Sequence, residues 1–249
     1  MRFIQMVFSP TGGTAAAAAA ITSDWPNAEL IDLTEQKEHD YCFEADDVVL
    51  VAMPSFGGLA PQAALDRLKN IQGNGAKCVL AAVYGNRAID DTLIQMEDAV
   101  EAKGFRVIAA ISAVAQHSML PQYATGRPDA QDAAQLKGFS EKILEKAAAN
   151  DCSKPQLPGN RPYKKPGSGM VPKAGSACTA CGLCAQKCPM GAIDAQNPKL
   201  TDKSKCIGCM RCVSVCPTHA RSISKVMACV AAVALKKACS DRKENVLYI

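Results

Sequence analysis

The chain has 249 residues, of which 48% are hydrophobic and 21% charged, a composition that can bury a core and that excludes broad disorder. No apolar run approaches the roughly 20 residues needed to cross a bilayer, and the starting sequence MRFIQMVF is too short for a signal-peptide core. We therefore expect a cytoplasmic protein without a membrane span, made of one large or two moderate domains.

Residues 1–150 alternate between apolar runs and segments of helical composition. The run at 48–53 is apolar throughout, as expected of a strand covered on both faces. This alternation predicts an α/β fold with a doubly wound, five-stranded parallel sheet. The predicted strands are residues 2–8, 29–33, 48–53, 77–84 and 105–114, and the predicted helices are residues 15–21, 61–70, 91–103 and 129–149.

The composition changes after residue 150. Residues 150–175 are rich in proline, glycine and lysine and lack apolar periodicity, which predicts an extended linker. We divide the chain into a domain at 1–150, a linker at 151–173 and a second domain at 174–249. The second domain ends in a predicted helix at 226–238 and a charged tail.

Eight of the 13 cysteines lie in two runs, CTACGLCAQKCP and CIGCMRCVSVCP, both spaced C-x2-C-x2-C-x3-C-P. The second run repeats the first at a constant offset of 28 residues. In a reducing compartment this pattern favours metal ligation over disulfides. Zinc sites, which typically use two pairs of ligands, fit two runs of four poorly. The remaining cysteines have no ligand spacing and are expected to be idle or buried thiols: Cys42, Cys78, Cys152, Cys229 and Cys239.

The doubled run resembles that of bacterial ferredoxins, which carry two [4Fe–4S] clusters in a small α+β fold. In such proteins the fourth cysteine of each run binds the other cluster. The resemblance therefore implies one cluster held by Cys178, Cys181, Cys184 and Cys216, and a second held by Cys206, Cys209, Cys212 and Cys188. Gly182 and Gly208 are expected to supply the tight turns that wrapping a cluster requires.

The charge is divided unevenly between the two halves of the chain. Residues 1–150 hold 12 basic and 19 acidic side chains, a net −7, whereas residues 151–249 hold 16 and five, a net +11. A basic half is also typical of nucleic-acid binding. Two anionic clusters would offset part of the positive charge, so we favour that explanation over nucleic acid.

The first predicted strand is followed by the loop Ser9, Pro10, Thr11, Gly12, Gly13 and Thr14. The loop has neither the GxGxxG spacing of a dinucleotide site nor the GK[ST] of a Walker loop. It resembles the T/S-x-T-G-x-T loop of flavodoxins, where hydroxyls and backbone amides at a helix start surround the phosphate of FMN without a cation. Generic turn chemistry in an α/β domain is the alternative.

Two further glycine-containing loops follow the third and fourth predicted strands, at the sheet edge where ligands of such folds bind. Phe56 and Tyr84 are candidates to stack on the flavin ring, and Asn86 and Arg87 to contact its carbonyl oxygens or the phosphate. The stretch at 115–118 is expected to border the same mouth or to be an ordinary loop. The candidate residues of the two loops are Pro54, Ser55, Phe56, Gly57, Gly58, Tyr84, Gly85, Asn86 and Arg87.

Nearly the whole chain resembles the fused flavodoxin–ferredoxin proteins of anaerobic bacteria and archaea. The stretches FSPTGGT, PSFGG, VYGNR and AQHS, then the doubled cysteine run, occur in that family's order. The resemblance implies a flavodoxin-like sheet of order 2-1-3-4-5, FMN as cofactor, and electron transfer between FMN and the two clusters with redox proteins as partners.

Three alternative functions stay open at this point. The chain is an electron carrier that links one- and two-electron partners, or a flavin-dependent reductase of a small organic acceptor fed by the clusters. A third alternative is a non-redox sensor of a phosphate ligand with structural clusters. A homodimer is compatible with each of them.

Overall fold

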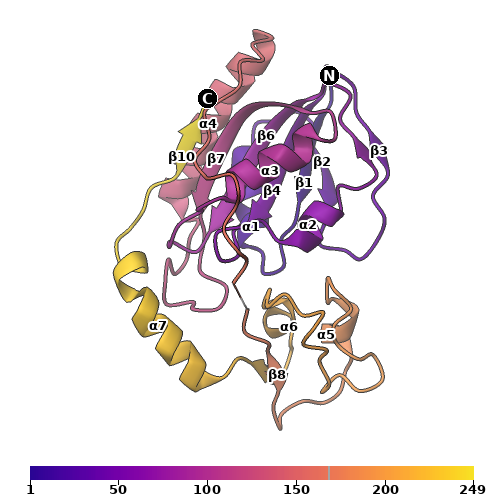
Figure 1. Ribbon diagram of the computed structural model, residues 1–249, viewed down its shortest axis with the longest axis vertical. Helices are drawn as coiled ribbons and strands as arrows, with labels where there is room; N and C mark the ends of the chain where they lie inside the picture. The colour runs from indigo at the N-terminus through magenta and orange to yellow at the C-terminus, as the bar shows by residue number, and fades with distance from the viewer. Residues whose placement is uncertain (168) are drawn as a thin grey trace.

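The computed structural model describes residues 1–167 and 169–249. Its centre is a six-stranded sheet in the order β10-β7-β6-β4-β1-β2 (Figure 1). Five strands are parallel, and β10 pairs antiparallel with β7. The bounds are β1 (Phe3–Val7), β2 (Glu29–Asp32), β4 (Val48–Pro54), β6 (Lys77–Tyr84), β7 (Arg106–Val114) and β10 (Val246–Tyr248).

The five parallel strands, counted along the chain, have the order 2-1-3-4-5, which confirms the predicted flavodoxin-like sheet. The sixth strand, β10, was not predicted. It comes from the charged tail assigned to the second domain, so the chain returns to the sheet after the cysteine runs. Its three residues give too short an apolar run to separate a strand from a loop.

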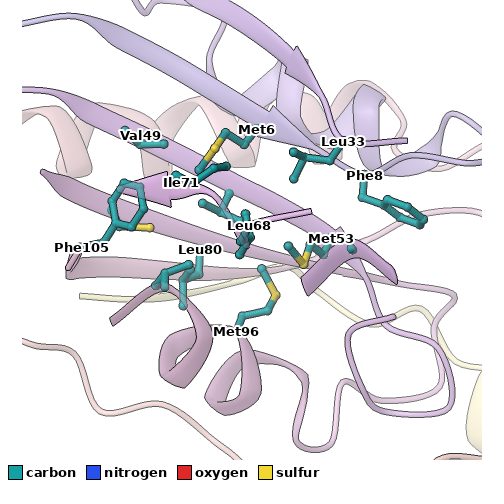
Figure 2. Packing of buried hydrophobic residues seen from close by; sticks show 14 of the residues in the cluster. Met6, Phe8, Leu33, Val49, Met53, Leu68, Ile71, Leu80, Met96 and Phe105 are labelled. Carbon is teal, nitrogen blue, oxygen red and sulfur yellow. The ribbon is translucent and has the colours of Figure 1, made fainter. Parts of the chain in front are cut away.

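Two helices cover each face of the sheet. On one face, α1 (Gly13–Ile21) packs against α4 (Ala130–Ala148), and the alanines of α1 allow a close approach to the sheet. On the other face lie α2 (Gln62–Asp66) and α3 (Thr92–Glu101), whose apolar side chains enter the core shown in Figure 2. In that core Leu68, Leu80 and Met96 are almost fully buried. A short parallel pair, β3 (Tyr41–Cys42) and β5 (Ile71–Gln72), lies outside the main sheet.

The predicted linker follows the surface of the first domain and is pinned to α3. Arg161 contacts the carboxylates of Asp98 (2.5 Å) and Glu97 (2.8 Å). The amides of Asn160 and Lys164 donate to the Asp91 carboxylate at 2.9 and 2.7 Å. These contacts fix the direction in which the chain enters the cysteine segment.

The cysteine segment forms a small lobe, which Figure 1 shows beside the end of the α/β domain. Strands β8 (Lys173–Ala174) and β9 (Arg221–Ser222) pair antiparallel, and one-turn helices α5 (Leu183–Gln186) and α6 (Arg211–Ser214) lie between them in the sequence. This arrangement agrees with the predicted small α+β ferredoxin domain. We call residues 173–222 the cluster lobe.

The predicted tail helix is α7 (Lys225–Cys239), which connects the cluster lobe to β10. One side of α7 is apolar and solvent-exposed, with Val226, Val230 and Val233 each at least 60% accessible. No helix within residues 1–167 and 169–249 combines the length and hydrophobicity needed to span a membrane.

Candidate functional site: a flavin-type cavity beside two cysteine cages

The phosphate loop lies between β1 and α1. Gly12 caps α1 in the left-handed conformation, at φ 96°, which a residue without a side chain adopts at low cost. Ser9 is buried; its amide donates to Thr34 Oγ1 (2.8 Å) and its Oγ accepts the amide of Ala15 (2.9 Å). The serine hydroxyl therefore shapes the loop and keeps its own O–H to donate, so its role as a phosphate contact stays a prediction.

The first amides of α1 make the loop suitable for an anion. Ala15 and Ala16 donate to Ser9 Oγ and to the carbonyl of Gly12, but the amides of Gly13 and Thr14 have no acceptor in the part of the chain that the structure describes. The first turn of α1 contains no acidic residue. Free amides and a positive helix end together favour a phosphate group.

A cavity of about 190 Å³ opens beside this loop. It lies where β4, β6 and β7 end, the edge at which ligands of doubly wound sheets bind. Thr11, Gly13 and Thr14 line its phosphate end. The loops that follow β4, β6 and β7 line the remainder of the cavity. Their lining residues are Pro54, Ser55, Phe56, Gly57, Tyr84, Gly85, Gln116, His117, Ser118 and Met119. The structure thus brings the predicted loops together at one cavity.

The cluster lobe and the end of the linker supply the opposite wall. Ile207 and Gly208, from the second cysteine run, line the cavity together with Gly167 and Gly169. Gly208 has a φ of 64°, and a β-carbon there would lie 3.2 Å from the α-carbon of Gly169. The two glycines let the linker and the cysteine run touch backbone to backbone. Sequence reasoning missed this wall because it joins segments distant in the sequence.

A second cavity of about 560 Å³ adjoins the first. The two share Thr11, Gly13 and the stretch from Gln116 to Ser118. The second cavity continues along α6, where Met210 and Ser214 line it. The site therefore has room for a group beside the one that occupies the phosphate loop.

His117 borders both cavities with a fixed ring. Its Nδ1 accepts the amides of Met119 (3.2 Å) and Leu120 (3.3 Å), so the proton of the neutral ring is on Nε2. Burial lowers the pKa of His117, which keeps the ring neutral near pH 7. A β-carbon on Gly85 would lie 2.7 Å from the ring, so a glycine is needed for this close packing. His117 thus offers one hydrogen-bond donor at a defined position.

Three predicted residues lie away from the cavity. The side-chain amide of Asn86 donates to the carbonyls of Cys239 and Asp241, each at 2.8 Å. Arg87 pairs with the carboxylate of Asp90, and Gly58 packs against that same carboxylate. Asn86, Arg87 and Gly58 do not line the cavity, so their role as flavin contacts stays a prediction. In the structure Asn86 holds the chain between α7 and β10.

The eight cysteines of the two runs surround two separate cavities. One is lined by Cys178, Cys181, Cys184 and Cys216, and the other by Cys188, Cys206, Cys209 and Cys212. Each set contains three cysteines of one run and the fourth of the other. Among the described residues, no three His, Cys, Asp or Glu side chains converge as ligands of a single metal ion. The thiols of each set line a space, an arrangement that fits a multinuclear cluster.

The two runs repeat each other in their backbone as well as their sequence. Left-handed residues occur at equivalent places: Ala180 and Gly208, Gly182 and Met210, and Gly191 and His219. The fourth cysteine of each run accepts an amide four residues later, Ala192 to Cys188 Sγ (3.4 Å) and Ala220 to Cys216 Sγ (3.3 Å). Such bonds stabilise charge on sulfur when a thiolate is ligated.

The thiols of the second run are the more deeply buried. Burial raises the pKa of Cys209 to about 12 and that of Cys212 to about 11. These thiols therefore carry protons near pH 7 until a metal displaces them. In the set formed by Cys178, Cys181, Cys184 and Cys216, Cys181 is exposed and Cys178 is partly exposed. The two cages thus differ in access from solvent.

Comparisons with known proteins agree with the two parts of the chain. Residues 177–221 match the family model described as a 4Fe-4S dicluster domain. This match confirms the predicted pair of [4Fe–4S] clusters. A search of curated proteins finds no match.

Solved structures similar to the chain include oxidised flavodoxins 1 and 2 from Bacillus cereus. Flavodoxin 1 is 14% identical with a TM-score of 0.41, covering 58% of this chain and 98% of its own; flavodoxin 2 is 15% identical with a TM-score of 0.43, covering 59% and 99%. Rubredoxin oxygen:oxidoreductase from the anaerobe Desulfovibrio gigas is 13% identical with a TM-score of 0.44, covering 59% and 36%. The fold assignment rests on the strand order of the sheet. A flavodoxin-like domain is therefore joined here to a segment that matches a 4Fe-4S dicluster domain.

Proposed function

We propose that this protein transfers electrons between FMN in the first domain and an external redox protein, through its two [4Fe–4S] clusters in a fixed order. The observation that carries the proposal concerns Ile207. This residue lines the flavin-type cavity and also the cage of Cys188, Cys206, Cys209 and Cys212. One residue thus borders both cofactor sites, which makes this cage the proximal one.

The residues around the flavin-type cavity suit FMN. The amides of Gly13 and Thr14 and the hydroxyl of Thr11 would hold the phosphate. Phe56 and Tyr84 supply the aromatic surface for the ring, and His117 Nε2 a hydrogen-bond donor. When bound, FMN exchanges one or two electrons, whereas each cluster exchanges one.

The cage of Cys178, Cys181, Cys184 and Cys216 is then the distal one. Its exposed Cys181 makes it the point at which a partner protein approaches. The wall of Ile207 and Gly208 closes one side of the flavin-type cavity with protein. A flavin covered by protein on that side and an exposed cluster together favour a route that leaves the protein through the distal cluster.

A variant without the distal cluster tests this order. Cys178→Ser with Cys181→Ser should retain FMN, but its reduced flavin should lose most of its rate of reoxidation by cytochrome c, a one-electron protein acceptor. Rapid mixing under anaerobic conditions measures this rate, and Cys152→Ser is the matched control because Cys152 lines neither cage. An unchanged rate in the double variant would show that electrons leave directly from the flavin.

The second cavity favours an alternative function, the reduction of a small organic acceptor. It adjoins the flavin-type cavity, and its volume of about 560 Å³ is that of a small-molecule site. In that case His117, which borders both cavities, would orient the acceptor. Saturable turnover of one small molecule, with its rate reduced in Ser214→Trp, would distinguish this reductase from a carrier, because Ser214 lines the second cavity and neither cage.

We propose redox proteins as the external partners and the cytoplasm as the compartment, because eight thiols must stay reduced to hold iron. A homodimer would use the exposed apolar side chains of α7, which are Val226, Met227, Val230 and Val233. Sedimentation at two protein concentrations would detect it.

A further inference from the structure

Arg211 reaches from the cluster lobe to the phosphate loop. It lies in the second cysteine run between Cys209 and Cys212, at the start of α6. Its Nη1 donates to the carbonyl of Pro10 at 3.0 Å, across 201 positions of the sequence. Pro10 directly precedes Thr11 at the phosphate end of the flavin-type cavity. Arg211 thus places a positive charge beside a loop that contains no basic residue.

Arg211 is also built into the proximal cage. It lines the cavity of Cys188, Cys206, Cys209 and Cys212. Its Nε is buried and has no hydrogen-bond partner in the described part of the chain. A buried guanidinium donor without an acceptor is costly, so this nitrogen does not itself stabilise the fold.

The internal repeat shows that the position of Arg211 within a cysteine run does not have to be an arginine. The equivalent residue of the first run, 28 positions earlier, is Leu183, at the start of α5. Both runs have the same left-handed turns and the same amide-to-sulfur bond. The cage of the first three cysteines is lined by Arg221 of β9 and not by Leu183, so a run of this kind does not require arginine at this position. Arg211 differs from Arg221 in that it also contacts the phosphate loop, through the carbonyl of Pro10.

We propose that Arg211 is a binding and positioning residue for FMN, supplied by the cluster lobe to the phosphate loop of the other domain. Its guanidinium fixes the loop through Pro10 and contributes the positive charge that favours a phosphate monoester. The inference rests on the proposed FMN site. It also implies that the two sites are coupled, since Arg211 lies between two cysteines of the proximal cage.

The variant Arg211→Leu copies the first run and should therefore keep both clusters. Its dissociation constant for FMN, measured by anaerobic fluorescence quenching, should rise about tenfold or more, as expected for a lost hydrogen bond to a charged group. Riboflavin, which lacks the phosphate, should bind wild type and variant alike. Lys203→Leu, which removes an exposed cation of the same lobe, is the matched control and should leave both ligands unaffected.

Iron content shows whether Arg211→Leu has kept its clusters. If it has lost them, the neutral and polar variant Arg211→Gln is used in its place, and the same rise in the dissociation constant for FMN is expected. Unchanged FMN affinity in a variant with intact clusters would overturn the inference. Equal weakening of FMN and riboflavin would also overturn it, because the effect would then not act through the phosphate. Failure of the wild-type protein to bind FMN would instead refute the proposed function.

Discussion

Replacing Asn86 by alanine tests whether this residue holds the carboxyl-terminal segment or binds the flavin. Asn86 is 3% exposed, its Nδ2 donates to two carbonyls at 2.8 Å, and its Oδ1 accepts the amide of Lys243 at 3.3 Å. At about 1 kcal/mol for each lost bond, we expect local opening of the chain between α7 and β10 to become about 2–3 kcal/mol easier. This corresponds to a factor of about 30 to 150 in the opening equilibrium.

Native-state hydrogen exchange measures this opening. Backbone amides at 239–248 should exchange faster in Asn86→Ala by that factor, while the FMN affinity of the folded protein stays unchanged. Gln62→Ala is the control, since it removes only the exposed bond to Asp66 (2.9 Å) and should alter neither quantity. Weaker FMN binding with unchanged exchange would refute the structural role and restore Asn86 as a flavin contact.

Two further predictions concern a buried ion pair and the exchange of cysteines. Asp132→Asn should lower the free energy of unfolding by about 3–5 kcal/mol in urea titrations, because it leaves the buried guanidinium of Arg127 without its charge partner. Burial opposes ionisation of Asp132, but hydrogen bonds from Arg127 and the Asp129 amide outweigh burial and lower the pKa of Asp132. The ionised carboxylate therefore stabilises the fold above the usual pKa of 3.8, and this stabilisation is lost as the pH falls below that value. An unchanged dependence of stability on acid pH in Asp132→Asn would contradict this. Cys188→Ser should reduce iron from about eight to about four atoms per chain, and Cys188→Ser with Cys206→Ser should lose no more; loss of all iron in the double variant would place the two residues in different cages.

The parallel sheet was predictable because its strands are apolar runs between helices. The strand at Lys77–Tyr84 has the predicted bounds. All of its residues are buried, and the sequence is an unbroken apolar run after Lys77. The helix predicted at 61–70 is shorter, ending at Asp66, because the chain then turns into β5. Local composition does not show where such a turn begins, since the pairing of β5 with β3 is non-local.

The parts of the site that sequence reasoning missed all depend on contacts between distant segments. The phosphate loop and the two cysteine runs have local spacing, so they were found. The wall of Ile207 and Gly208 and the reach of Arg211 to Pro10 depend on how the cluster lobe docks. The linker at 151–173 has the composition of a free chain, yet Arg161 pins it to α3. Long-range ion pairs from Lys154, Arg161 and Lys164 hold the linker in place without leaving a local sequence pattern.

Flavin and iron content after anaerobic purification is the measurement that tests the central claim most directly. We expect about one FMN and about eight iron atoms per chain, the content of one flavin site and two [4Fe–4S] clusters. Eight iron atoms with no FMN, either copurified or bound on addition, would contradict it. The cavity beside the phosphate loop would then serve another ligand, and electrons would not pass between a flavin and the clusters in this protein.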